Sequence, residues 1–190
     1  MSADYHFEKK ITGENFREEG FASGEYEQCV FTRCDFAGVR LDESVFIECE
    51  FISCDLSNAT VRATNFRGVH FRSSKLLGID MSAANAAMID VRFEECKLDH
   101  ASFINLPLKK TEFKDCSLKR VFFSETDLTG AIFTNCDFSE AIFGRTNLNK
   151  ADLSTSYNFI IDPLENTIKK AKFSAEGAIG LLHSFDIIIK

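Results

Sequence analysis

Large apolar residues recur at every fifth position through most of this 190-residue chain. One run begins at Phe16 and ends at Met81, and after two extra residues a second run begins at Met88 and ends at Leu153. Each run contains 14 such residues, and 15 of the 20 phenylalanines lie on them. Because an α-helix repeats about every 3.6 residues and a flat strand every second residue, the period of five indicates neither of these elements.

A smaller residue lies two positions before most of the large ones, and the three remaining positions of each quintet are mainly polar. The pattern predicts one narrow and one wide inward side chain per quintet, with a turn between quintets. The smaller residues are Cys29, Cys34, Val39, Ser44, Cys49, Cys54, Ala59, Thr64, Ala101, Thr111, Ala131, Ala141, Thr146 and Ala151.

Three quintets, "CDLSN" (54–58), "CDFSE" (136–140) and "ADLST" (151–155), match the motif A(D/N)LXX. Over residues 14–155 the chain resembles the pentapeptide-repeat family. That resemblance implies an all-β fold, a right-handed quadrilateral β-helix of about seven coils, in which four quintets make one coil of about 20 residues. We expect an N-terminal cap over 1–13, the solenoid over 14–155 with a register break at 82–88, and a C-terminal capping and dimerisation module over 156–190.

The cysteines test this geometry, because all seven occupy the small inward position. Cys96, Cys116 and Cys136 are 20 residues apart, so they should lie in a single interior column. A role in packing is favoured, since buried cysteine behaves as a small hydrophobe. The sequence contains no CxxC pair and its four histidines are scattered, which disfavours a metal site. No cofactor is predicted, and disulfides between coils are sterically possible but disfavoured in a reducing compartment.

Composition restricts the partners and the compartment. No apolar run reaches the roughly 18 residues of a membrane span, and the polar start "MSADYHFEKK" lacks the pattern of a signal peptide. With an odd number of cysteines, this favours the cytoplasm. The net charge of −7, all of it within residues 1–158, disfavours direct binding to nucleic acid or to an anionic membrane.

The period is disturbed at two places. "DMSAANAAMID" (80–90) contains the two extra residues, which form either a small bulge or an exposed feature that a partner contacts. In "INLPLKK" (104–110), Leu106 occupies a small-residue position and Pro107 lacks a backbone donor, so we expect locally distorted pairing there.

After Leu153 the period ends. Asp162-Pro163 predicts a turn, residues 168–173 a short strand, residues 175–185 a helix capped by Ser174, and residues 187–189 a terminal strand. We expect this segment to cap the last coil and to form a two-fold homodimer interface; capping alone is the alternative. The predicted interface residues are Ala178, Ile179, Leu182, Phe185, Ile187, Ile188 and Ile189.

Enzyme signatures are missing: the chain has no GxSxG, no phosphate-binding glycine loop and no HExxH. A closed coil filled with phenylalanine also leaves no cavity for a substrate. The sequence therefore predicts a protein without catalytic activity.

Within the family, the chain is most similar to the topoisomerase-protecting members, among them the Qnr, MfpA, McbG and AlbG proteins. The shared features are the chain length, "KLLGID" (75–80), "FINLPLKK" (103–110) and the tail "IDPLENTIKKAKF" (161–173). The resemblance implies a dimeric rod that mimics B-form DNA and binds DNA gyrase or topoisomerase IV, protecting it from quinolones or peptide toxins. The alternative is a scaffold or regulatory module with another protein partner.

Mimicry of DNA requires acidic side chains on the outside of the coils. The net charge over residues 1–158 gives a mean field weaker than that of DNA, so the acids would have to concentrate on particular faces. The candidates are Asp35, Asp42, Glu43, Glu48, Glu50, Asp55, Glu94, Glu95, Glu112, Asp115, Asp127 and Asp137. Simple solubility is the alternative role for each of them.

Overall fold

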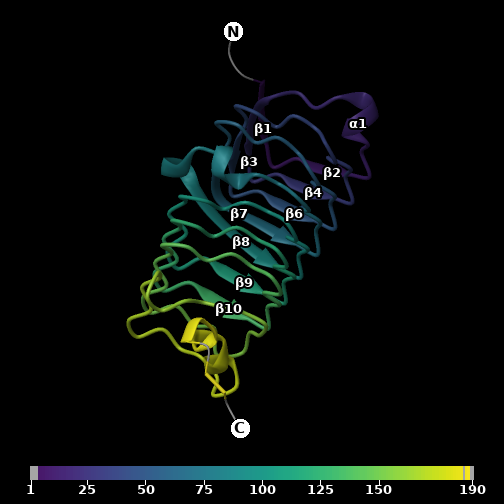
Figure 1. Ribbon diagram of the computed structural model, residues 1–190. Coiled ribbons are helices and arrows are strands. Elements are labelled where there is room, and N and C mark those ends of the chain that lie inside the picture. The colour runs from purple at the N-terminus through teal and green to yellow at the C-terminus, as the bar shows by residue number, and fades with distance from the viewer. Residues whose placement is uncertain (1–3, 186, 189–190) are drawn as a thin grey trace.

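The computed structural model describes residues 4–185, 187 and 188. In these residues the chain winds into a stack of parallel coils (Figure 1). The strands are short because each occupies only one side of a coil. They are β1 (Asp4–Phe7), β2 (Lys10–Thr12), β3 (Gly24–Glu27), β4 (Val30–Thr32), β5 (Val45–Ile47), β6 (Glu50–Ile52), β7 (Asn65–Arg72), β8 (Ile89–Glu94), β9 (Glu112–Lys114) and β10 (Ile132–Thr134). The helical pieces are α1 (Phe16–Glu19) and four 3₁₀ turns, Met81–Ala83, Ala86–Met88, Gly177–Leu181 and His183–Phe185.

The register has a period of 20 residues, and each coil has four pairing sites. We name four faces by one bridged pair each: face A by Asp35↔Asp55, face B by Arg40↔Thr60, face C by Val45↔Asn65 and face D by Glu50↔His70. β1, β3 and β5 lie on face C, and β2, β4, β6, β9 and β10 lie on face D. All these pairings are parallel. The predicted all-β solenoid of about seven coils is confirmed.

The corners between faces lie two positions after each large apolar residue. The backbone there takes the left-handed conformation, with φ of 51° at Glu48, 55° at Asn58 and 58° at Lys110. Glycine takes this conformation at no steric cost, and other residues at a modest one. Most corner N–H groups donate to a carbonyl in the next coil, such as Gly38 N to Ser57 O at 2.8 Å. These bonds offset the strain and fix the five-residue step.

The large apolar residues fill the interior in stacked columns. On face D the rings of Phe51, Phe71, Phe93, Phe113 and Phe133 stack at centroid distances of 5.1, 5.3, 5.0 and 4.9 Å. These offset ring stacks add to the energy of burial. All five rings are essentially inaccessible to solvent.

The cysteines occupy the narrow interior position, as predicted. Lys97 bridges Ser117, which bridges Asp137, so the residues before them, Cys96, Cys116 and Cys136, form one buried column. The Cys116 thiol donates to the Lys114 carbonyl at 3.3 Å. Burial raises the pKa of two other cysteines to about 12: Cys54, which lies in the same column, and Cys49, which lies on face D. The thiols of Cys49 and Cys54 therefore stay protonated, and burial of the whole set of cysteines is consistent with a role in packing.

The two extra residues form a bulge of two 3₁₀ turns between faces B and C. The side chains of Asp80 and Asn85 each accept a hydrogen bond from the backbone two residues on, at 3.1 and 3.2 Å. The pairing of β7 with β8 shifts register at this point. Pro107 lies one coil later, beside Ala86 and Ala87 of the bulge. The adjacent Asp127 N bonds to Leu106 O at 2.9 Å, so the ladder resumes at once.

At the C-terminal end the ladder extends beyond the apolar period, because Asn147 bridges Thr167 and Asp152 bridges Lys172. The helix predicted from 175 to 185 is wrong in type: the segment forms 3₁₀ turns, and Gly177 and Gly180 disfavour a longer helix there. Ser174 does cap it, since its hydroxyl accepts from Gly177 N at 2.8 Å. Ile187 and Ile188 are not in a strand, and Ile189 lies outside the described residues. Within the described chain, no helix has the length and apolarity needed to cross a membrane.

Candidate partner-binding surfaces

The structure distributes the twelve predicted acidic residues over all four faces and their corners. It does not bring them together on one side of the rod. Asp35, Asp55 and Asp137 lie on face A; Asp42 and Glu43 on face B and its corner; Glu48 and Asp127 on face C and its corner; and Glu50, Glu94, Glu95, Glu112 and Asp115 on face D and its corner.

Some of these acids have a structural role in the turns. Where an aspartate precedes the large apolar residue, its Oδ1 accepts a hydrogen bond from the backbone N–H two residues later. The distances are 2.9 Å for Asp35, 3.0 Å for Asp55, 3.1 Å for Asp127 and 3.1 Å for Asp137. The local preference of aspartate for this turn explains its presence without a partner.

Ion pairs neutralise six of the twelve. Asp55 meets Lys75 at 3.5 Å, one coil away, and Asp42 meets Arg40 on its own coil at 3.9 Å. The remaining pairs are Asp35–Arg17, Asp127–Lys109, Asp137–Lys119 and Glu94–Lys114. Paired carboxylates contribute little to a long-range negative field.

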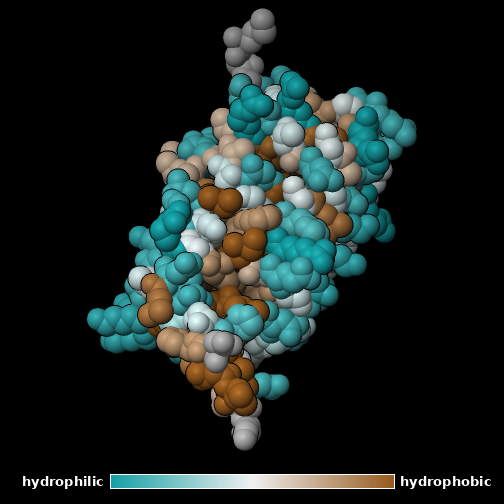
Figure 2. All heavy atoms as spheres, viewed as in Figure 1, coloured by the Kyte–Doolittle hydropathy of each residue, from teal (hydrophilic) through white to brown (hydrophobic). Residues whose placement is uncertain are grey.

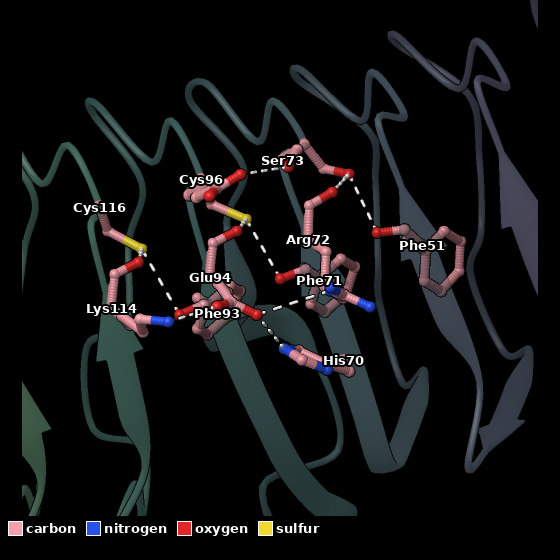
Figure 3. Close-up of polar contacts among 12 residues, drawn as sticks. Phe51, His70, Phe71, Arg72, Ser73, Phe93, Glu94, Cys96, Lys114 and Cys116 are labelled. Carbon is pink, nitrogen blue, oxygen red and sulfur yellow. Dashed lines mark hydrogen bonds and ion pairs between the residues drawn. The ribbon is translucent and has the colours of Figure 1, made fainter.

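Glu94 is the most strongly neutralised acid (Figure 3). Its carboxylate lies 2.7 Å from Lys114 Nζ, 3.5 Å from Arg72 Nε and 3.9 Å from His70 Nε2. The hydrogen bond from Lys114 is the main reason why the pKa of Glu94 is lowered. Burial, followed by repulsion from Arg72, lowers the pKa of His70, so this histidine is neutral at pH 7. The cluster joins three coils on face D and leaves Glu94 with no free negative charge.

The other six predicted acids have no ion pair among the described residues: Glu43, Glu48, Glu50, Glu95, Glu112 and Asp115. Three of them accept neutral hydrogen bonds, Glu48 from Gln28, Glu95 from Ser73 and Asp115 from Asn135. Neutral donors leave the charge in place. These six are the predicted residues that remain available to a partner.

The negative charge is concentrated at the N-terminal end of the rod. Residues 1–63, the first three coils, contain 13 acids and 6 bases, a net −7, whereas residues 64–190 contain 16 of each. Acidic side chains lie close together in these coils. A hydrogen bond with Glu14, and the electrostatic repulsion between the two carboxylates, raise the pKa of Glu19. Counting charge coil by coil, with the register known, would have found this from the sequence.

Five carboxylates of these coils lie on or beside face C and form what we call the N-terminal acidic patch. None has an ion pair among the residues described. Sequence reasoning missed three of them: Glu8 lies before the first repeat, and Glu25 and Glu27 flank Tyr26 within the repeats but were not among the predicted acids. The patch consists of Glu8, Glu25, Glu27, Glu43 and Glu48.

The C-terminal end carries exposed apolar side chains (Figure 2). Ile179, Leu182 and Phe185 are 50, 38 and 46% exposed, and Ile188 is 87% exposed. Ile187 is also exposed and Ala178 is half-buried. Leu164, at 80%, was missed by sequence reasoning because it follows a proline outside any period. The described residues contain no group of His, Cys, Asp or Glu side chains arranged to hold a metal ion.

Two turn aspartates predict how stability depends on pH. Hydrogen bonds from Ser139 and Asn158 outweigh burial and lower the pKa of Asp137 to about 2, and the hydrogen bond from Lys172 lowers that of Asp152 to about 2. A carboxyl with a lowered folded-state pKa stabilises the fold above its unfolded pKa of about 4.

We therefore expect the free energy of unfolding to fall as the pH drops from about 4 to about 2. In Asp137→Asn/Asp152→Asn the turns persist, because Asn147 makes the same turn at 3.2 Å. That variant should lose about 1–2 kcal/mol per site at pH 7 and show a shallower decline in acid. Urea unfolding at several pH values measures this; an unchanged decline would contradict it.

A comparison with models of protein families agrees with this architecture. A family model described as a pentapeptide repeat region matches residues 24–86 and 82–153. No curated protein sequence matches the chain. Among solved structures, full-length QnrB1, described as a plasmid-mediated fluoroquinolone resistance protein, is 16% identical, covering 97% of this chain and 100% of QnrB1 with a TM-score of 0.47. HetL from Nostoc sp. strain PCC 7120, described as involved in heterocyst differentiation regulation, is 11% identical, covering 92% and 86% with a TM-score of 0.42. Since the two model matches span most of the coils, this chain belongs to the pentapeptide-repeat family.

Proposed function

We propose that this protein is a non-catalytic, cytoplasmic rod that binds the DNA-binding surface of DNA gyrase or topoisomerase IV as a mimic of duplex DNA. In doing so it would protect the enzyme from a poison, such as a quinolone or a peptide toxin, or modulate its activity. The resemblance of "FINLPLKK" and of the tail to topoisomerase-protecting family members supports this choice of partner.

The observation that carries the proposal is the charge density of the first three coils. Three coils at about 4.8 Å each span about 14 Å, and they hold the whole net charge of −7. Duplex DNA has one charge per about 1.7 Å, hence about eight charges over 14 Å. The N-terminal coils therefore match DNA in charge per length, although the mean over the whole rod does not.

The N-terminal acidic patch places part of this charge on one side of the rod. Its glutamates lie on and beside face C, where β1, β3 and β5 pair in register and hold the backbone flat and rigid. A fixed array of carboxylates loses little conformational freedom on binding and steers association with a basic surface. We propose that face C of these coils contacts the topoisomerase.

The proposal includes a homodimer formed through the C-terminal segment. The exposed side chains of Ile179, Leu182 and Phe185 extend the surface past the last coil. Clustered exposed apolar residues mark interaction sites in soluble proteins. A two-fold axis there would place an acidic patch near each end of a longer rod.

A supercoiling assay tests the proposal. We expect the wild-type protein to inhibit gyrase at high concentration, or to rescue it from a poison at lower concentration. The variant Glu25→Gln/Glu43→Gln/Glu48→Gln should need roughly tenfold more protein for the same effect, because it removes part of the steering field. The control Glu95→Gln/Glu112→Gln/Asp115→Asn removes the same charge from face D and should behave as wild type.

A scaffold for a different protein is the competing function. It predicts no effect of the wild-type protein on supercoiling, no rescue and no capture of gyrase. Equal loss of activity in the two triple variants would instead show that total charge, and not the N-terminal acidic patch, governs binding.

A further inference from the structure

The opposite half of face C is basic. On the coils that contain Pro107, Asp127, Asn147 and Thr167, face C and its corner toward face D hold five lysines and one acid, Asp127. The corner toward face B holds Glu125, which pairs with Arg145, and Glu165. We call these lysines the C-terminal basic patch: Lys109, Lys110, Lys150, Lys169 and Lys170. All five are exposed.

The register places these lysines close together although they are far apart in sequence. Lys110 N bonds to Thr129 O at 3.0 Å, and Lys150 N bonds to Lys169 O at 2.9 Å, so the corner residues of successive coils are stacked. Lys110, Lys150 and Lys170 all take the left-handed corner conformation, with φ of 58°, 60° and 61°. They occupy one edge of the rod over three coil steps, about 14 Å.

Most of this positive charge is available. Lys109 meets Asp127 at 3.2 Å, but the other four lysines have no ion pair among the described residues. The amide oxygens between them are occupied: Asn149 Oδ1 accepts from Lys169 N at 2.8 Å, and Asn147 Oδ1 accepts from the Thr167 hydroxyl at 3.0 Å. Nothing on the patch therefore competes for the four free ammonium groups.

The composition of the patch favours phosphate over a protein partner. Its outward positions hold Lys, Asn, Thr, Gly, Pro107 and Asp127, with no aromatic or large apolar side chain. Protein interfaces rely on such anchors. A second copy pairing through face C would bury about 400 Å² on each side, given about 40 Å of length and 10 Å of width. The total of about 800 Å² is below the roughly 1,200 Å² total of a stable interface.

We propose that the C-terminal basic patch binds the phosphate backbone of duplex DNA. One strand presents a phosphate per about 3.4 Å of axis, so about four phosphates lie along 14 Å, one for each free lysine. Lysine binds phosphate as a point charge, and no side chain here is suited to read bases. Binding is therefore independent of sequence.

The overall charge of −7 does not prevent this contact. Glu48 and Lys110 lie on the same edge but about three coil steps, or 14 Å, apart. The screening length at physiological salt is about 8 Å, so the N-terminal acidic patch and the basic patch act almost independently. The expectation that the protein has no direct nucleic-acid contact rested on the total charge, which hides this separation.

The test is fluorescence anisotropy with the full chain, without topoisomerase, and a labelled 20-base-pair duplex at 50 mM salt. We expect binding whose log–log salt slope is about −3.6, as for four neutralised phosphates. Lys110→Gln/Lys150→Gln/Lys170→Gln should weaken binding at least tenfold and bring the slope close to −1. The control Lys75→Gln/Lys97→Gln/Lys119→Gln removes the same charge from face A and should bind as wild type.

Three results would overturn the proposal: no binding at 50 mM salt, equal weakening in both triple variants, or a basic-patch variant that dissociates a dimer in sedimentation without DNA. Because gyrase is absent, failure here leaves the supercoiling result intact, and the reverse also holds.

Discussion

Replacing Phe71 by alanine should lower the free energy of unfolding by about 3–5 kcal/mol, the range for deleting a fully buried phenylalanine side chain. The ring is inaccessible to solvent and stacks between Phe51, at 5.1 Å, and Phe93, at 5.3 Å. It also meets Phe66 edge-on at 6.0 Å. The cavity cannot collapse, because the coils above and below are held by the backbone ladder.

The position of Phe71 makes the loss larger than at an end of the rod. In repeat proteins each coil is stabilised chiefly by its neighbours, so a weakened central coil uncouples the two halves. Urea unfolding should therefore show a lower midpoint and a broader or two-step transition. Ile142→Ala removes an apolar side chain that is 45% exposed and serves as the control, with an expected loss under about 1 kcal/mol. A loss below about 1.5 kcal/mol in the Phe71 variant would contradict the stacked-column account.

The coils were predictable because one local rule is repeated 28 times. A large apolar residue every five positions requires a corner in each quintet, and cysteines 20 residues apart then require a common column. The end of the chain follows this rule only in part. Asn158 and Pro163 interrupt the apolar period, but Ile168 and Phe173 lie 15 and 20 residues after Leu153 and pack against the core. Thr167 and Lys172 accordingly find ladder partners one coil back.

The candidate surface was predictable only in part. Residue type alone predicts that the acids lie on the outside. Whether an acidic side chain is free to contact a partner depends on the residues that lie next to it one coil away. Lys75 lies 20 residues from Asp55 and Lys114 lies 20 from Glu94, so a register-aware reading can pair them. Lys109 reaches Asp127 across 18 residues, and that pairing depends on side-chain geometry that the period does not contain. Face C is acidic in its N-terminal half and basic in its C-terminal half, and this difference can be recognised only when the coils are aligned in register.

Changing Gly180 to alanine should detach the C-terminal turns from the last coil. A Cβ atom at this position would overlap the backbone carbonyl of Phe159, which cannot move because Phe159 is buried under the turns. Ile161 N also bonds to Gly180 O at 3.2 Å. We expect a loss of about 1–3 kcal/mol, as for an overpacked site. Gly144→Ala is the matched control, because its Cβ would lie 3.4 Å from the Ser124 hydroxyl, an ordinary contact.

Gly180→Ala and Leu182→Asp together separate capping from dimerisation. Leu182 is 38% exposed, so an aspartate there should cost the monomer less than about 1 kcal/mol. If the C-terminal segment forms the proposed interface, Leu182→Asp gives monomers in sedimentation at nearly wild-type monomer stability, because a charge would be buried between two copies. Gly180→Ala then loses both the dimer and the cap, since it displaces the segment that holds Ile179 and Leu182. A dimer that survives Leu182→Asp would assign the segment to capping alone, and a Gly180→Ala protein as stable as Gly144→Ala would show that the turns do not cap the coil.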